Sequence, residues 1–271
     1  MPSSTRPPSW AGSFYPDDPG HLRSLISDLH QKAAKEKVDL GGAKLRALIL
    51  PHAGYIYSGL TAAHGTILLE NQQVKTVMLL GPAHHVGVAG SAVSRATAYK
   101  TPLGEIPVAP WGEKLQEEYA DLFQENIASE QAEHSLEVIL PFLQESLGDF
   151  SLMPLVVGQT DTKRTAQALA PLITDDVLLV ISSDLSHFLD DESAVQKDRQ
   201  TLEAILDMDM TALQVNDNKA CGMVGIQILL HLARLKNWQP RFLHYANSGD
   251  ATGDRDQVVG YGAIAFTKEN P

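Results

Sequence analysis

The chain has 271 residues, of which 44% are hydrophobic and 20% charged, and its formal net charge is −12 at pH 7. This length and apolar content suffice for one large buried core, so we predict a single domain over residues 1–271. The acidic balance argues against nucleic-acid binding, which requires a basic surface to neutralise phosphates. No segment reaches the roughly 18 consecutive apolar residues of a membrane span, the Pro- and Ser-rich N-terminus lacks a signal-peptide core, and the single cysteine agrees with a reducing compartment. We therefore predict a cytoplasmic protein.

The apolar pattern predicts that helices and strands alternate along the chain. Residues 91–110 differ, because their β-branched residues, Pro and Gly predict a hairpin-like excursion. The alternation predicts an α/β fold with a mainly parallel central sheet flanked by helices. We expect helices over residues 18–37, 59–70, 112–123, 135–147, 162–173, 191–207 and 222–235, and strands over 45–51, 75–80, 150–157 and 176–182 and in the C-terminal segments PRFLHYANSGD and VVGYGAIAFT.

Histidines and a carboxylate follow three of the predicted strands. His52 follows LRALIL, His84 follows KTVMLLG, and Asp184 and His187 follow VLLVIS. Since ligands of open α/β sheets bind beyond the carboxyl ends of the strands, we expect these side chains to meet at one edge of the sheet. His52 is equally explained as a loop histidine bonded to a neighbouring carbonyl. Asp184 and His187 could instead be the N-cap and a surface residue of the next helix.

Cys221 is the only cysteine of the chain and precedes the predicted helix that begins at residue 222. A lone cysteine is often a small buried apolar residue, but a helix N-terminus favours the thiolate form. Two imidazoles and a thiolate from His52, His84 and Cys221 suit Fe, Zn or Cu and leave coordination positions open. The pattern therefore predicts a reactive metal site at these residues.

Four further residues are predicted to lie near the site. His85 and His134 are expected to support the metal ligands, together with Glu133. The alternative for Glu133 is a role at the start of the helix predicted over residues 135–147, where Ser135 and nearby acids resemble a helix N-terminus. Tyr55 is expected to contact a substrate or ligand at the rim.

Several short segments of the chain resemble one known family. In their order and spacing they are similar to the Memo family, whose prokaryotic members are called AmmeMemoRadiSam system protein B. The resemblance covers almost the whole chain, through AGSFYP, PHAGYIYSG, GPAHH, EHSLEVILPFL, PLVVG, SSDLSH, ACG and YANSGD.

The resemblance implies a fold similar to class III (LigB-type) extradiol dioxygenases, which use non-haem Fe(II). By this resemblance His52, His84 and Cys221 are metal ligands, His187 is a general acid/base, and Asp184 lines the same pocket. The expected cofactor is one transition-metal ion, Fe(II) or Cu, with Zn as an alternative because a thiolate replaces the carboxylate of the dioxygenases. The family name also implies AMMECR1-like and radical-SAM proteins as partners.

These observations leave three hypotheses about function. The first is a mononuclear metal-dependent oxidoreductase in which His187 moves a proton and Asp184 orients it. The second is a non-catalytic protein that binds a peptide or small molecule in the same crevice. The third is a metallohydrolase, since three protein ligands and a water also describe catalytic zinc.

Overall fold

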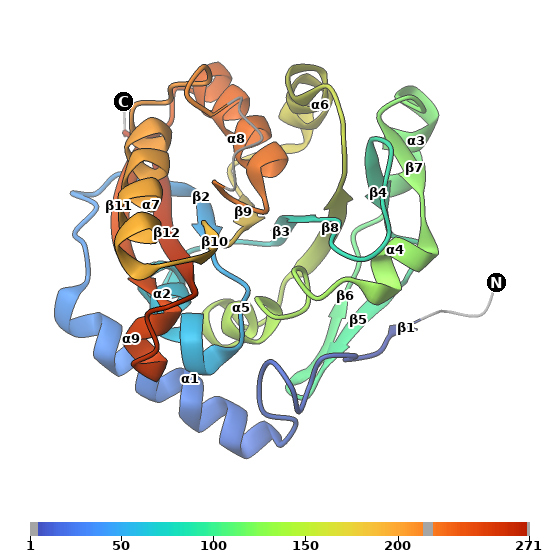
Figure 1. Cartoon of the computed structure of the whole chain (residues 1–271). Helices are drawn as coiled ribbons and strands as arrows, with labels where there is room; N and C mark the ends of the chain where they lie inside the picture. Colours follow the sequence, from blue (N-terminus) through green and yellow to red (C-terminus); the bar gives the residue numbers. More distant parts are fainter. Residues whose placement is uncertain (1–4, 214–218, 270–271) are drawn as a thin grey trace.

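A mixed β-sheet forms the centre of the structure, a computed structural model that describes residues 5–213 and 219–269 (Figure 1). Within that part of the chain the strand order is β10-β12-β2-β9-β3-β8-β4-β7, and β11 pairs with β12. The large-sheet strands are β2 (Lys44–Leu50), β3 (Thr76–Pro82), β4 (Ser91–Val93), β7 (Phe123–Glu125), β8 (Ser151–Val157), β9 (Val177–Ser182), β10 (His187–Leu189), β11 (Gln239–Asn247) and β12 (Val258–Lys268).

The middle of this sheet is parallel, as predicted. Strands β2, β9, β3 and β8 are neighbours in that order and all run in the same direction. Their nearly continuous apolar sequences are typical of strands buried on both faces. Antiparallel pairings of β12 with β2 and of β4 with β8 extend the sheet on each side, which makes it mixed.

Helices cover both faces of the sheet, which agrees with the predicted α/β fold class. In Figure 1, α6, α7 and α8 lie on one side of the sheet and α1, α2 and α5 on the other. The α-helices are α1 (Pro19–Ala33), α2 (Tyr55–Thr66), α3 (Gly112–Glu118), α4 (Ile127–Ala132), α5 (Leu140–Leu147), α6 (Thr162–Leu169), α7 (Asp191–Leu206), α8 (Met223–Lys236) and α9 (Ser248–Thr252), with short 3₁₀ turns at Ala34–Glu36, Ile67–Leu69 and Ala170–Leu172.

Alternate residues of each central strand supply two separate cores. Ile49, Leu80 and Ile181 belong to the core beneath α6 and α8, whereas Leu50 and Val180 belong to the core that includes α5. Side chains alternate between the faces of a strand, so an apolar residue at every position buries both faces. This double burial fixes the register of the strands and the positions of the loops that follow them.

The predicted excursion at residues 91–110 contains a hairpin. Strands β5 (Ala98–Thr101) and β6 (Gly104–Pro107) pair antiparallel, and β1 (Thr5–Arg6) pairs parallel with β5 in a separate small sheet. The same segment begins with β4, which joins the large sheet and was not predicted.

The helices expected over residues 18–37 and 162–173 end in 3₁₀ turns, and two other predicted helices are shorter for reasons of packing or sequence. The helix expected over residues 112–123 ends at Glu118, because Phe123 is fully buried in β7 beside β4. The helix expected over 135–147 begins at Leu140, where Pro141 occupies the first turn that proline tolerates. Residues before Leu140 therefore form turns near the carboxyl end of β3, and this difference bears on the site.

Candidate metal centre

His52 lies two residues beyond β2, and its ring is oriented by a chain of hydrogen bonds. Its Nδ1 is 2.6 Å from Ser182 Oγ, and this hydroxyl donates to the carbonyl of Ser135 at 2.6 Å. Because the single hydroxyl proton is used there, His52 Nδ1–H must be the donor to Ser182. The lone pair of His52 therefore lies on Nε2, which is 3.4 Å from Cys221 Sγ. Burial, more than the neighbouring His84, lowers the pKa of His52 to about 3, so its ring is neutral at physiological pH.

His84 follows β3 and is held at two points by the carboxylate of Glu133. His84 Nδ1 donates to Glu133 Oε1 at 2.8 Å, and the His84 backbone N–H donates to Oε2 at 2.7 Å. The backbone N–H of Ser135 adds a third hydrogen bond to Oε1, at 2.9 Å. Burial raises the pKa of Glu133, but the hydrogen bonds from His84 and Ser135 outweigh it and bring the pKa to about 2. The carboxylate therefore stays ionised and leaves Nε2 of His84 as the nitrogen with a free lone pair.

Cys221 brings a sulfur to the same place from the loop before α8. The backbone N–H of Asp184 donates to Cys221 Sγ at 3.2 Å, and the N–H of Gly222 donates to Ser183 Oγ at 2.9 Å. One ligand atom each of His52, His84 and Cys221 lie within 4.8 Å of one another. His52 and His84 are 32 positions apart in the sequence, and His84 and Cys221 are 137 apart. The fold brings their donor atoms together at the carboxyl edge of β2, β9 and β3.

The protonation of Cys221 differs from the sequence prediction. We expected the N-terminus of α8 to favour the thiolate, but burial and then the nearby carboxylate of Asp184 raise the pKa of this thiol well above its ordinary value. Desolvation of the anion and its repulsion by Asp184 outweigh the helix dipole. Without a cation beside it, Cys221 is a neutral thiol and a poor nucleophile.

Asp184 links the loops that carry His52 and Cys221. Its Oδ1 accepts the backbone N–H of His52 at 2.8 Å, and its Oδ2 lies 3.9 Å from His52 Nε2. Burial raises the pKa of this carboxyl group. The alternative role as a helix N-cap is wrong, because β10 follows Asp184 and α7 is capped by Asp190 instead. His187 is the half-buried first residue of β10 and lies close enough to influence both Asp184 and His52 electrostatically.

His134 and His85 lie beside the two imidazole ligands, within a group of aromatic rings. The His134 ring stacks on His84 at 4.6 Å between centroids and contacts Phe14 at 4.8 Å. His85 stacks on Trp10 at 5.7 Å. Burial lowers the pKa of His134 to about 4, and its Nδ1 lies 3.3 Å from Glu133 Oε1 without an aligned hydrogen bond. These rings pack beside the imidazole ligands, but His84 and His85 remain exposed to solvent.

Trp10 and Phe14 of this aromatic group belong to the N-terminal arm, residues 5–16. A buried carboxylate, that of Glu137, holds this arm in place. Glu137 accepts hydrogen bonds from Arg6 Nη1 at 2.6 Å, from the backbone N–H of Trp10 at 2.7 Å and from Tyr15 Oη at 2.6 Å. Charged hydrogen bonds of this kind are among the strongest in proteins. The position of the AGSFYP segment beside the site is therefore fixed by Glu137, which lies more than 120 positions away in the sequence.

Tyr55 does not occupy the place that we predicted for it. Its side chain is buried between Tyr15 and Phe142, and its hydroxyl donates to the carbonyl of Val138 at 2.8 Å. Tyr55 therefore anchors the first turn of α2 in the core, and its hydroxyl is already used in a hydrogen bond within the protein. The sequence pattern also missed Ser182, Trp10 and Phe14, which contact the predicted residues directly.

A second group of possible ligands shares His84. One atom each of His84, Glu133 and His134 also lie within 4.8 Å of one another. Glu133 already accepts three hydrogen bonds from His84 and Ser135, so a cation there would have to displace them. The donors of His52, His84 and Cys221 have free lone pairs and are chemically the better set for a soft or borderline metal.

Comparison with known proteins identifies the family of the chain. A family profile described as "Memo-like protein" matches residues 6–265. The chain belongs to the Memo family. Its Memo-family relatives include a MEMO1 family protein of Sulfolobus acidocaldarius, 36% identical over 96% of this chain and 99% of the relative, and MEMO1 family protein TV1383 of Thermoplasma volcanium, 30% identical over 97% and 99%. Membership confirms the predicted resemblance and its LigB-like α/β fold class.

A solved structure supports the fold alone. The crystal structure of uncharacterized protein JW3007 from Escherichia coli K12 aligns with a TM-score of 0.53 at 13% identity, covering 82% of this chain and 99% of that one. At this identity the likeness shows the fold and carries no argument about the site. Among the described residues, no helix of this Memo-family chain is both long and apolar enough to cross a membrane.

Proposed function

We propose that this Memo-family chain binds one transition-metal ion through His52, His84 and Cys221 and acts as a mononuclear metal-dependent oxidoreductase. The observation that supports the proposal most directly is the orientation of both imidazoles. Each Nδ1–H donates to a fixed acceptor, Ser182 or Glu133, which leaves Nε2 available. Metal-binding histidines in proteins usually have this second hydrogen bond, because it fixes the tautomer and orients the ring.

The donor set also fits the proposed metals. Two neutral imidazoles and one sulfur suit Fe, Cu or Zn, whereas Mg and Ca prefer oxygen ligands. A bound metal of this kind supplies Lewis acidity and, if it is Fe or Cu, a redox couple. The raised pKa of Cys221 is consistent with a thiol whose proton leaves only when a cation takes its place.

The remaining residues would hold and orient the reacting groups. Asp184 fixes the backbone of His52 through Oδ1 and the sulfur of Cys221 through its own N–H. Half-buried His187 is the residue that we propose to move a proton, because it is partly open to solvent and lies close enough to His52 and Asp184 to influence both electrostatically. The rings of Trp10, Phe14 and His134 cover part of the imidazole side, where His84 stays exposed to solvent.

A metallohydrolase is the second candidate, and the same donor set favours it. Two histidines and a cysteine with open positions also describe catalytic zinc. The identity of the metal distinguishes this candidate from the oxidoreductase. A non-catalytic binding protein is the third candidate, and it requires no metal.

The test is metal content after anaerobic exposure to Fe(II), Cu(I) or Zn(II). We expect close to one metal per chain in the parent and a large loss in His52→Ala and Cys221→Ser. His21→Ala is the matched control, because this exposed histidine on α1 lies outside the site, and it should retain the metal. A parent protein that retains no metal would refute the proposal and favour the non-catalytic binding protein.

A further inference from the structure

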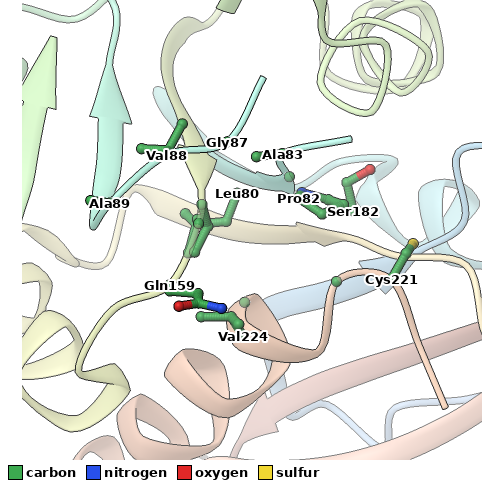
Figure 2. Close-up of a pocket in the computed structure, with 15 residues that line it drawn as sticks. Leu80, Pro82, Ala83, Gly87, Val88, Ala89, Gln159, Ser182, Cys221 and Val224 are labelled. Atoms are coloured by element: carbon green, nitrogen blue, oxygen red, sulfur yellow. The ribbon is translucent and has the colours of Figure 1, made fainter. Parts of the chain in front are cut away.

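A cavity of about 550 Å³ adjoins the metal centre on the side of Cys221. It lies beyond the carboxyl ends of β3 and β8 and against the first turn of α8. Figure 2 shows Cys221 at one end of this cavity, Val88 and Ala89 at the other, and Gln159 and Val224 along one wall. This volume is in the range of small-molecule sites in proteins.

The wall of the cavity is uncharged in the part of the chain that the structure describes. Its apolar surface comes from residues such as Leu80, Val157 and Val224, and its polar side chains are Ser182, Gln159 and Cys221. No Lys, Arg, Asp, Glu or His is among its described lining residues. A charged group that entered this space would lose its hydration without meeting a counter-charge.

The surroundings further disfavour an anion. The chain as a whole has a net charge of −12. The rings of Trp10, Phe14 and His134 pack together on the side of the two imidazoles. The uncharged cavity is lined by Cys221 and by Ser182, which orients His52, so a small molecule in it lies beside the proposed ligands.

One polar feature remains for recognition. The first turn of α8 lines the cavity, and no side chain caps this helix. The first backbone N–H groups of a helix have no intrahelical acceptor and can donate to an oxygen of a ligand. The amide of Gln159 provides a second polar contact on the wall.

We propose that this cavity is the substrate compartment of the site and takes an uncharged organic molecule that carries a carbonyl or hydroxyl oxygen. The inference rests on the proposed function, because it assigns the substrate class of that metal centre. The oxygen accepts hydrogen bonds at the α8 end, the apolar part packs on the valines and Leu80, and the reacting end faces Cys221.

The single cysteine of the chain allows a direct test. Iodoacetamide and iodoacetate are nearly isosteric alkylating reagents, and only the second is anionic. The rates of alkylation of Cys221 by both reagents are measured on the metal-free full chain and divided by their rates with a small free thiol. The raised pKa of Cys221 slows both reactions by the same factor, which cancels when the two normalised rates are compared. We expect the normalised rate to be at least about tenfold higher for iodoacetamide, because the carboxylate of iodoacetate would lose hydration in the uncharged cavity without meeting a counter-charge.

Two variants should narrow the cavity without touching the metal ligands. A Cβ at Gly87 would meet no atom within 4 Å, so this position can carry a side chain, and Gly87→Leu adds volume to the cavity wall. Val224→Trp adds volume at another position of the wall. Both should slow alkylation by iodoacetamide at least about fivefold, in keeping with a loss of access of about 1 kcal/mol. Val195→Trp, at an exposed position on α7, is the matched control and should leave the rate unchanged.

Two results would overturn the inference. One is a normalised rate for iodoacetate that equals or exceeds that for iodoacetamide, which would indicate an anion site at the N-terminus of α8. The other is an unchanged rate of alkylation in both narrowed variants. Metal content of the same preparations is measured separately, so a loss of metal binding would refute the proposed function while the alkylation rates still decide the character of the cavity.

Discussion

Replacement of Glu133 by glutamine should weaken metal binding, although the two side chains have nearly the same shape. The carboxylate of Glu133 is the acceptor in all three of its hydrogen bonds. The donors are His84 Nδ1–H, the His84 backbone N–H and the Ser135 backbone N–H. A glutamine has only one oxygen, so its NH₂ group must face one of these donors. If it faces His84 Nδ1, the ring must change tautomer, and the proton then occupies the Nε2 that would bind the metal.

The expected loss of metal affinity in Glu133→Gln is about 10–100-fold, the range found when a group that orients a metal-binding histidine is removed. In the other orientation of the amide, the His84 backbone N–H is left without an acceptor, which costs about 1–3 kcal/mol of folding free energy. Metal affinity is measured by competition with a chelator, and the free energy of unfolding by urea denaturation of the metal-free chain.

The parent and the variant should also differ in acid. The pKa of Glu133 is depressed in the folded state to about 2 from an ordinary value of 4.5, and its side chain is 1% exposed. The stability from this carboxylate is therefore complete above the unfolded pKa and is lost as the pH falls from about 4.5 toward 2, by about 3 kcal/mol. Glu133→Gln should lack this component of the acid dependence.

Glu130→Gln provides a matched control for this prediction. Glu130 is also a buried carboxylate near the end of the N-terminal arm, but it accepts from the hydroxyls of Tyr99 and Ser94, which can rotate to suit an amide. This variant should keep the metal affinity of the parent. A metal affinity of Glu133→Gln within threefold of the parent would refute the argument that Glu133 fixes the tautomer of His84.

Three further changes test other contacts of the site. Ser182→Ala removes the acceptor of His52 Nδ1–H and should weaken metal binding about tenfold, whereas Ser182→Thr keeps the hydroxyl and should restore it, as measured by chelator competition. Burial holds the pKa of His134 near 4, so the unfolded chain binds the proton first as the pH falls from about 6.5 to 4. The parent should therefore lose up to about 3 kcal/mol more unfolding free energy than His134→Phe over this range. Equal losses of unfolding free energy in urea titrations of the two proteins would contradict this prediction. Gly222→Ala places a Cβ 2.6 Å from the Cβ of Ser183, so the loop that carries Cys221 must move. The variant should lose about 1–3 kcal/mol of unfolding free energy and should bind the metal more weakly. Unchanged metal content would show that this loop tolerates the shift.

The sequence was sufficient to predict which strands carry the site. Long apolar runs identify β2, β3 and β9 as strands buried on both faces, and their carboxyl ends must lie at one edge of a parallel sheet. The structure places these strands side by side, and His52, His84 and Asp184 meet there. Their proximity follows from the strand pattern, without any information about individual contacts.

The contacts that orient these residues could not be predicted in the same way. Ser182 and His52 are 130 positions apart, and Glu133 and His84 are 49 apart. Local sequence around Glu133 suggested a helix start, because a carboxylate near a serine serves that purpose as readily as it holds a distant histidine. Tyr55 was misplaced for a similar reason, since its position at the start of α2 does not reveal whether the ring faces the core or the crevice.

The segment Ser182–Ser183–Asp184 explains why the site forms beside β9. This strand lies between β2 and β3, so the residues after it reach the loops on both sides. Ser182 orients the ring of His52, Ser183 accepts the N–H of Gly222, and Asp184 binds both the backbone of His52 and the sulfur of Cys221. Three consecutive residues thus hold two of the three proposed ligands, whereas His84 depends on Glu133. Disturbance of the segment after β9 should therefore displace His52 and Cys221 together and leave the hydrogen bonds of His84 in place.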